Sequence, residues 1–112
     1  MEHTCNTVTL RGSLHALPEL SHENHGKQFY RFYLEVPRLS GAVDILPIIV
    51  EEKILSSIDL SGGDMITVIG QIRSHNFREN GFRRLMIFVY AAFLNVEDGD
   101  PINEGLKVNL LL

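Results

Sequence analysis

The sequence predicts an all-β protein whose strands close into a small barrel. Short runs in which β-branched and aromatic residues alternate with polar ones are separated by clusters of Gly, Pro, Asn and Ser, a pattern typical of strands joined by turns. A length of 112 residues fits one compact domain. Apolar residues make up 45% and charged residues 21% of the chain, which excludes disordered, collagen-like and fibrous classes.

The first strand is expected over residues 7–15. Val8, Leu10 and Leu14 would lie on one face of this strand, and the polar residues between them on the other. Gly12 interrupts the strand. Because a glycine inside a strand often marks a bulge or a sharp bend, its position predicts a corner of a closed barrel.

A polar connection is expected over residues 16–26, and a second strand over residues 27–36. Apolar residues alternate along the second strand and predict its core-facing side. The other side would carry Phe29 and Tyr33 beside Arg31. Aromatic residues exposed in this way commonly mark a binding surface, and burial in a subunit interface is the alternative.

A third strand and a short helix are expected next. The strand covers residues 43–50, and its Pro47 favours an edge position or a bulge, because proline cannot donate a hydrogen bond to a neighbouring strand. The helix falls within residues 51–58. Its apolar residues are spaced as on one helix face and predict one or two turns that cap a barrel end.

The fourth and fifth strands are expected over residues 65–74 and 83–96. The segment between them, residues 75–82, contains Asn80-Gly81, which is a strong hairpin signal. We therefore expect a β-hairpin with an extended tip.

The chain changes character near its end. We expect residues 1–96 to form the barrel domain and residues 97–112 to form a flexible acidic tail that ends in the apolar segment 108–112. This last segment resembles the first residues of a strand. Three alternatives are open: it begins a second repeat of the domain, it pairs with a neighbouring molecule, or it packs on its own barrel.

The charge is distributed unevenly. The net charge of −4 does not favour nucleic acid or an anionic membrane as a partner of the whole surface. However, residues 71–84 contain four arginines against one glutamate, and these arginines interleave with Phe77 and Phe82. The pattern is typical of single-stranded nucleic-acid binding, since guanidinium groups meet phosphates and aromatic rings stack on unpaired bases. A solvated loop whose phenylalanines cover a barrel end is the alternative.

The sequence contains no motif for catalysis or metal binding. His22 and His25 lie in a polar loop without a third strong ligand, whereas zinc sites need three or four ligands. Gly62-Gly63 stands alone and forms no phosphate-binding loop. Cys5 has no neighbour that would activate its thiol. We therefore expect no enzyme activity, no cofactor and no metal.

The sequence favours a cytoplasmic location without a membrane partner. A single cysteine cannot form an intramolecular disulfide, and the N-terminus lacks the basic and then apolar pattern of a secretory signal. No apolar run reaches the roughly 20 residues that a membrane-spanning helix needs.

Five strands with a short helix between the third and the fourth form the layout of the OB-fold, a Greek-key barrel. Four stretches of the chain then carry a family resemblance: Asn6–Leu14, Leu17–Leu20, Phe32–Arg38 and Gly63–Ser74. Their order and spacing resemble those of bacterial single-stranded DNA-binding proteins from about residue 6 to residue 96. The most specific parts are Asn-x-Val-x-Leu-x-Gly in the first stretch and Gly-Gln-Ile-Arg-Ser in the last.

The resemblance implies a non-enzymatic homo-oligomer, a dimer or a tetramer, that wraps single-stranded DNA. It implies roles in DNA replication, recombination and repair in the bacterial cytoplasm or nucleoid, with replication or repair proteins as further partners. Phe77 falls where the family places a stacking aromatic, and Arg38 and Arg73 match its basic positions. A structural salt bridge is the alternative for Arg38.

The family tryptophans expected near the second and third strands are absent, because the chain has no Trp. Stacking contributes about 1–3 kcal/mol per base, so Tyr33, Phe29 or Phe82 would have to replace them.

The sequence therefore predicts an OB-fold module that binds single-stranded DNA through its second strand and its hairpin. The predicted contacts are Arg31, Tyr33, Arg38, Arg73, Phe77, Arg78, Phe82, Arg83 and Arg84. One alternative is a primosomal-type OB protein that bridges replication proteins. Another is a protein-interaction OB-fold without DNA binding. The negative net charge of the chain and the absence of tryptophan would allow it.

Overall fold

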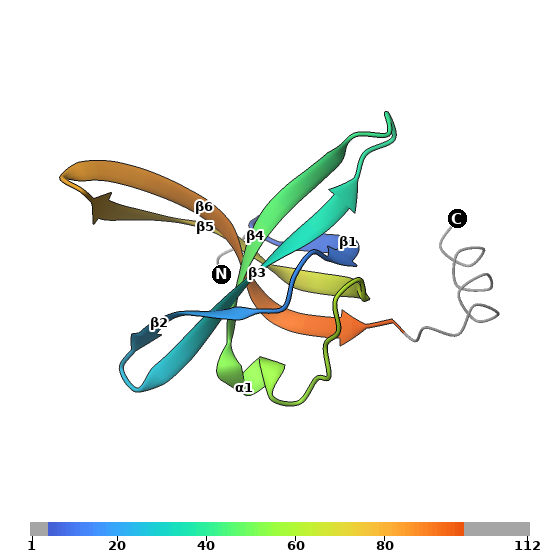
Figure 1. Ribbon diagram of the computed structural model, residues 1–112, viewed down its shortest axis with the longest axis horizontal. Coiled ribbons are helices and arrows are strands. Elements are labelled where there is room, and N and C mark those ends of the chain that lie inside the picture. The colour runs from blue at the N-terminus through green and yellow to red at the C-terminus, as the bar shows by residue number, and fades with distance from the viewer. Residues whose placement is uncertain (1–4, 98–112) are drawn as a thin grey trace.

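The computed structural model describes residues 5–97 and confirms the predicted all-β barrel (Figure 1). The described elements are β1 (Val8–Leu14), β2 (Glu19–Asn24), β3 (Lys27–Pro37), β4 (Val43–Glu51), α1 (Glu52–Leu55), β5 (Met65–Glu79) and β6 (Phe82–Val96). Within the described residues the strands form one sheet in the order β1-β5-β6-β4-β3-β2, and β1 also pairs with β3. This additional pairing closes the sheet into a barrel.

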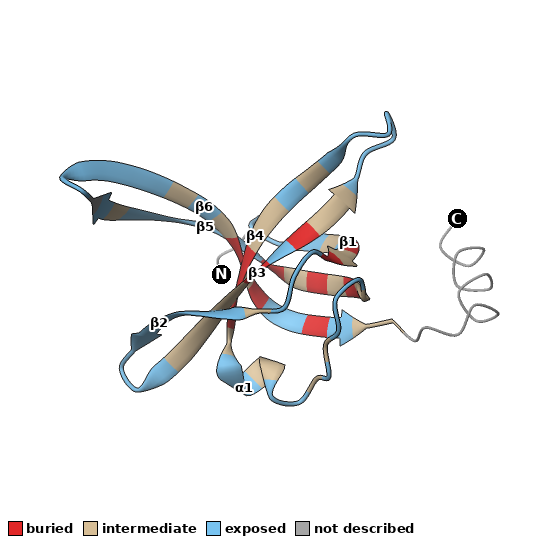
Figure 2. Ribbon diagram, in the orientation of Figure 1, coloured by how far each residue is buried: buried red, intermediate tan, exposed pale blue. Residues whose placement is uncertain are grey.

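The barrel core comes from the inward-facing residues of alternating strands. Phe32 and Leu34 of β3 are 1% and 0% exposed, whereas Tyr33 between them is 37% exposed. The alternation predicted for residues 27–36 is therefore confirmed. Figure 2 shows that the buried residues gather where the strands cross, while the far part of the β5–β6 hairpin is exposed.

The expectation that residues 16–26 are only a connection was wrong, because they contain β2. This strand pairs antiparallel with β3, and all six of its residues are exposed. A strand without a buried face has no apolar alternation, so its sequence pattern resembled that of a loop. The turn after it is made by His25 and Gly26, with φ of 52° and 79°, as in a type I′ hairpin turn.

The predicted hairpin of the fourth and fifth strands is confirmed, but its tip is shorter than expected. β5 continues to Glu79 and β6 begins at Phe82. The turn consists of Asn80 and Gly81, with φ of 53° and 82°. The residues predicted as an extended tip are therefore strand, and the hairpin is a long two-stranded arm that projects from the barrel (Figure 1).

The predicted cap and the predicted edge position are both present. Ile54, Leu55 and Ile58, in and after α1, pack against the core. β4 pairs with β3 along its whole length, but it pairs with β6 only at Ile48 and Ile49. Pro47 immediately precedes this contact, at a point where β4 has β3 on one side and no paired strand on the other, which is a local edge position of the kind that proline favours.

Gly12 lies where the barrel closes, as its interruption of the first strand predicted. β1 pairs with β5 up to Ser13 and with β3 from Ser13 onward. A Cβ atom added to Gly12 would lie 2.2 Å from the backbone oxygen of Glu35. Only glycine allows β1 to approach β3 this closely.

The chain ends lie beyond this description. Apart from Glu97, the predicted tail over residues 97–112 falls outside the described residues, as do residues 1–4. Among the helices of the described part, none has the length and apolar character needed to cross a membrane.

Replacing Gly12 with alanine is expected to destabilise the barrel, because the new methyl group must displace the backbone of Glu35. We expect a loss of about 1–3 kcal/mol in the free energy of unfolding, measured by denaturant titration. Gly62→Ala is the matched control, since an added Cβ there meets no atom within 4 Å. Equal stability of the two variants would contradict this account of barrel closure.

Candidate nucleic-acid interface

The outward side of β3 forms the first part of the candidate site. Phe29, Arg31 and Tyr33 alternate with the core residues of this strand. Residues opposite each other in neighbouring strands share a face, and Arg31 lies opposite Ile49 while Tyr33 lies opposite Pro47. Ile49 is only 4% exposed although it faces outward, so the side chains around it form a continuous layer over the barrel.

The β5–β6 hairpin continues this layer. Arg73 lies opposite Phe88, and Phe77 lies opposite Arg84. Tyr90, two residues beyond Phe88, lies beside Ile49 through the short parallel contact between β6 and β4. We call the resulting surface the outer face. Its members are Phe29, Arg31, Tyr33, Arg73, His75, Phe77, Arg84, Phe88 and Tyr90.

Guanidinium groups and aromatic rings are paired on the outer face. The Arg73 guanidinium lies 4.3 Å from the centre of the Tyr90 ring. The corresponding distances are 5.8 Å for Arg31 over Tyr33 and 6.0 Å for Arg84 over Phe77. Such contacts hold a cation against a ring, so each pair presents a positive charge and a flat apolar surface together.

Two histidines extend the rings of the outer face. The His22 ring of β2 stacks on Phe29 at 4.7 Å, with an angle of 10° between the two planes. The rings of His75 and Phe77 are also nearly parallel, at 6.4 Å. Phe29 in turn lies 6.2 Å from Tyr90. Rings from β2, β3 and β6 therefore follow one another across the surface, and β5 adds a separate pair.

An open groove lies between the β3–β4 and β5–β6 hairpins. Its volume is about 480 Å³, and its walls include Arg31, Tyr33, Phe77, Arg84 and Met86. The described residues that line it include no acidic side chain. The groove therefore combines positive charge with aromatic surface, which is the chemistry that an unpaired nucleic-acid strand requires.

The structure brings together five of the predicted contacts: Arg31, Tyr33, Arg73, Phe77 and Arg84. It separates Arg78 and Arg83 from them. These two arginines lie opposite each other, on the hairpin face that alternates with the outer face. Phe82 lies at the hairpin tip and is 74% exposed.

Arg38 is also separated from the outer face. Its guanidinium donates two hydrogen bonds to the carboxylate of Asp44, at 2.9 and 2.5 Å. Asp44 lies opposite Val36, on the side of β3 that alternates with Tyr33. These hydrogen bonds hold the pKa of Asp44 below its ordinary value, and the pair raises the pKa of Arg38.

Three residues of the outer face, Tyr90, Phe88 and His75, are not among the contacts that the sequence predicts. The spacing of Phe88 and Tyr90 could have identified them. Both are an even number of residues from Arg84, so within one strand they lie on the same face as Arg84. The sequence predicts His75 in the hairpin tip, whereas it lies in β5. Within residues 5–97, no three His, Cys, Asp or Glu side chains gather in a way that could hold a metal ion.

The closed barrel, its capping helix and the groove across its outer face define an OB-fold protein. The structure is similar to the dimeric N-terminal domain of PriB protein from Thermoanaerobacter tencongensis, with a TM-score of 0.72 and 38% identity over 83% of this chain and 97% of that one. The chain therefore belongs to the single-stranded DNA-binding protein (SSB) family of OB-folds, as its motifs indicated.

A second solved structure shares the fold. It is Plasmodium falciparum SSB in complex with single-stranded DNA, with a TM-score of 0.72 and 20% identity over 88% of this chain and 99% of that one. No family model matches the sequence, and no curated protein matches it.

The ion pair of Arg38 leads to a prediction about pH. Because the pKa of Asp44 is depressed in the folded protein, the pair stabilises the fold above the ordinary Asp pKa and loses this effect as pH falls through the folded value. An NMR titration of the Asp44 carboxyl carbon should give a midpoint below 3.8, and Arg38→Gln should raise it. Lys53→Gln, on α1, is the control. An unchanged midpoint in Arg38→Gln would show that the pair does not form in solution.

Proposed function

We propose that this protein binds and protects single-stranded DNA without sequence preference and without catalysis. The observation that carries the proposal is the outer face, on which guanidinium groups and aromatic rings are paired around an open groove. The arginines would neutralise phosphates, and the rings would stack on bases. Membership of the SSB family supports the proposal, as does the likeness to an SSB seen with single-stranded DNA.

The outer face also accounts for a preference for unpaired strands. In a duplex the bases are stacked inside and only their edges are accessible, so Tyr33, Phe77 and Tyr90 would have no base to stack on. A single strand can turn its bases toward these rings while its phosphates follow the arginines. The rings on β3 and β6 would thus replace the tryptophans that the family usually provides.

We further propose a homo-oligomer, a dimer or a tetramer, in which residues 1–96 form the DNA-binding domain. The related PriB domain is dimeric, which supports this assembly. The cellular roles would be in DNA replication, recombination and repair, in the cytoplasm or nucleoid and alongside replication or repair proteins. No cofactor takes part in this function.

A second candidate function is that of a primosomal-type protein that bridges replication proteins. The 38% identity to a PriB domain favours it. In this case the outer face would mainly serve protein contacts, and affinity for DNA would be weak.

Fluorescence anisotropy of a labelled oligo-dT, with duplex DNA of equal length as competitor, separates these functions. We expect binding that the duplex does not displace and that weakens steeply as the salt concentration rises, because phosphate contacts release counterions. Absence of binding at low salt would reject the first proposal and favour the second.

Two substitutions test the outer face. Phe77→Ala should remove about one stacked base, which weakens binding roughly 5- to 150-fold. Arg73→Ala should lower the slope of the logarithm of affinity against the logarithm of salt concentration by about 0.7. Phe93→Ala and Lys53→Ala are the matched controls, because neither residue belongs to the outer face. Phe93 lies opposite Ile69 of β5, and Lys53 belongs to α1. Equal effects of test and control variants would reject this site.

The same measurement tests the three predicted arginines that do not lie on the outer face. If Arg38, Arg78 and Arg83 contact DNA, each alanine variant should lower the salt slope as Arg73→Ala does. From their positions we expect a smaller effect on a short oligonucleotide.

A further inference from the structure

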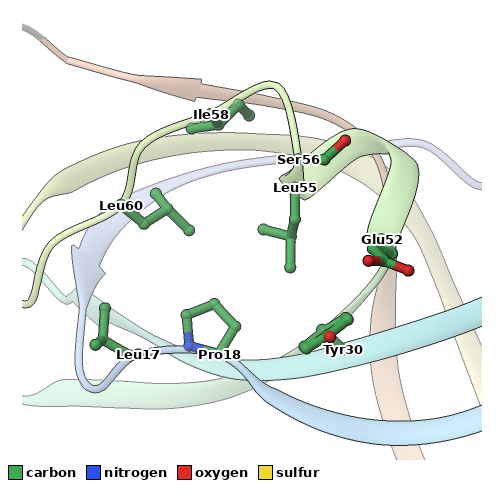
Figure 3. Close-up of a pocket in the computed structure, with 8 residues that line it drawn as sticks. All are labelled: Leu17, Pro18, Tyr30, Glu52, Leu55, Ser56, Ile58 and Leu60. Atoms are coloured by element: carbon green, nitrogen blue, oxygen red, sulfur yellow. The ribbon is translucent and has the colours of Figure 1, made fainter.

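An apolar pocket lies between β3, α1 and the segment before β2, and Figure 3 shows the side chains that line it. Its volume is about 350 Å³. Apolar side chains line it: Leu17, Pro18, Tyr30, Leu55, Ile58 and Leu60. Tyr30 alternates with Phe29 and Arg31 along β3, so the pocket is separate from the proposed DNA-binding surface.

One acidic side chain and two exposed leucines lie at the edge of the pocket. Glu52 of α1 lines it (Figure 3), and no basic side chain within residues 5–97 pairs with this carboxylate. Glu52 also lines a neighbouring polar hollow with Lys27 and Lys53, but neither lysine forms an ion pair with it. Leu17 is 58% exposed and Leu20 is 56% exposed, and Leu20 lies opposite Tyr30. A suitable occupant would therefore present a large apolar side chain beside a cation.

The tip of the β5–β6 hairpin carries this combination. Phe82 is the most exposed aromatic side chain of the described part, at 74%, and no ring contact within that part involves it. The next residue, Arg83, lies opposite Arg78. Like charges directly opposite each other destabilise a strand pair, so an acidic partner at this position would stabilise the tip.

We infer that the hairpin tip of one molecule docks in the apolar pocket of a second copy. The tip enters end-on. Phe82 fills the pocket, and Arg83, whose side chain leaves β6 on the opposite face, extends over the edge of the pocket toward Glu52. The charges are complementary: residues 71–84 carry four arginines and one glutamate, whereas the rest of the chain is acidic. Figure 1 shows the tip of the hairpin and α1 at well-separated ends of the molecule, so the contact joins different molecules.

This contact is heterologous, because it joins two different surfaces of the same chain. Such contacts generate open chains or rings rather than closed dimers. The area that one ring and its neighbours bury belongs to the weak class of interfaces, so association is expected at high protein concentration. On a long DNA strand, neighbouring molecules would be held together and the contact would make binding cooperative. The inference itself does not depend on DNA binding.

Sedimentation velocity over a series of protein concentrations, without DNA, tests the contact. We expect the wild type to grow beyond its basal oligomer, and Phe82→Ser and Leu17→Asp each to weaken this growth roughly tenfold or more. An equal mixture of the two variants should recover association between one molecule of each kind, since one supplies intact pockets and the other intact tips. Growth of either variant at the wild-type level would overturn the inference, as would a wild type without growth.

Two further variants keep the test informative if Leu17→Asp fails to fold. Glu52→Arg should abolish growth, and mixing it with Arg83→Glu should restore a complementary pair. Leu39→Asp is the matched control, because Leu39 is fully exposed but does not line the pocket. Anisotropy with a short oligo-dT should be the same for Leu17→Asp, Glu52→Arg and wild type, so loss of self-association is distinguished from loss of DNA binding.

Discussion

The alternation of side chains along β3 is the constraint on which the rest of the molecule depends. This strand pairs with β2 over Lys27–Arg31, with β4 over Phe29–Pro37 and with β1 at Leu34 and Glu35. Its inward residues form the centre of the core, and its outward residues carry Arg31 and Tyr33. A shift of register by one residue would exchange the two sets and bury a guanidinium group, at a cost of several kcal/mol. Core and candidate interface are therefore fixed by the same register.

Features that depend on local alternation could be predicted from the sequence, whereas features that depend on pairing could not. The core side of β3 follows directly from its pattern. β2 was missed because all its residues are exposed and only its backbone is paired. Tyr90 joins the outer face through the parallel contact with β4, which brings together segments far apart in the chain. Arg83 and Arg84 lie on opposite faces of the hairpin because both strands extend to the Asn80-Gly81 turn, which sets their register. The sequence predicted an irregular tip there, so this separation could not be predicted.

The short contact between β4 and β6 explains why the interface is a groove. Only Ile48 and Ile49 of β4 pair with β6, so the two hairpins diverge beyond this point. A free two-stranded ribbon is only marginally stable. The side chain of Asn6 supports the base of the β5–β6 hairpin, since its amide exchanges two hydrogen bonds with the backbone of Ile72, at 2.8 and 2.9 Å. A ligand that bridges the groove would brace both hairpins, so binding and ordering of the arms are coupled.

The two faces of the β5–β6 hairpin allow one basic segment to serve two partners. Arg73 and Arg84 lie on the outer face, whereas Arg78 and Arg83 lie on the alternate face, so a strand bound in the groove leaves the second pair accessible. The two contacts should also respond differently to salt. Phosphate neutralisation depends steeply on ionic strength. In the contact between molecules salt screens only the single ion pair of Arg83 with Glu52, whereas the burial of Phe82 in an apolar pocket is not screened. Rising salt would therefore release DNA before it separated neighbouring molecules, and cooperativity would persist over a range in which the affinity of each molecule falls.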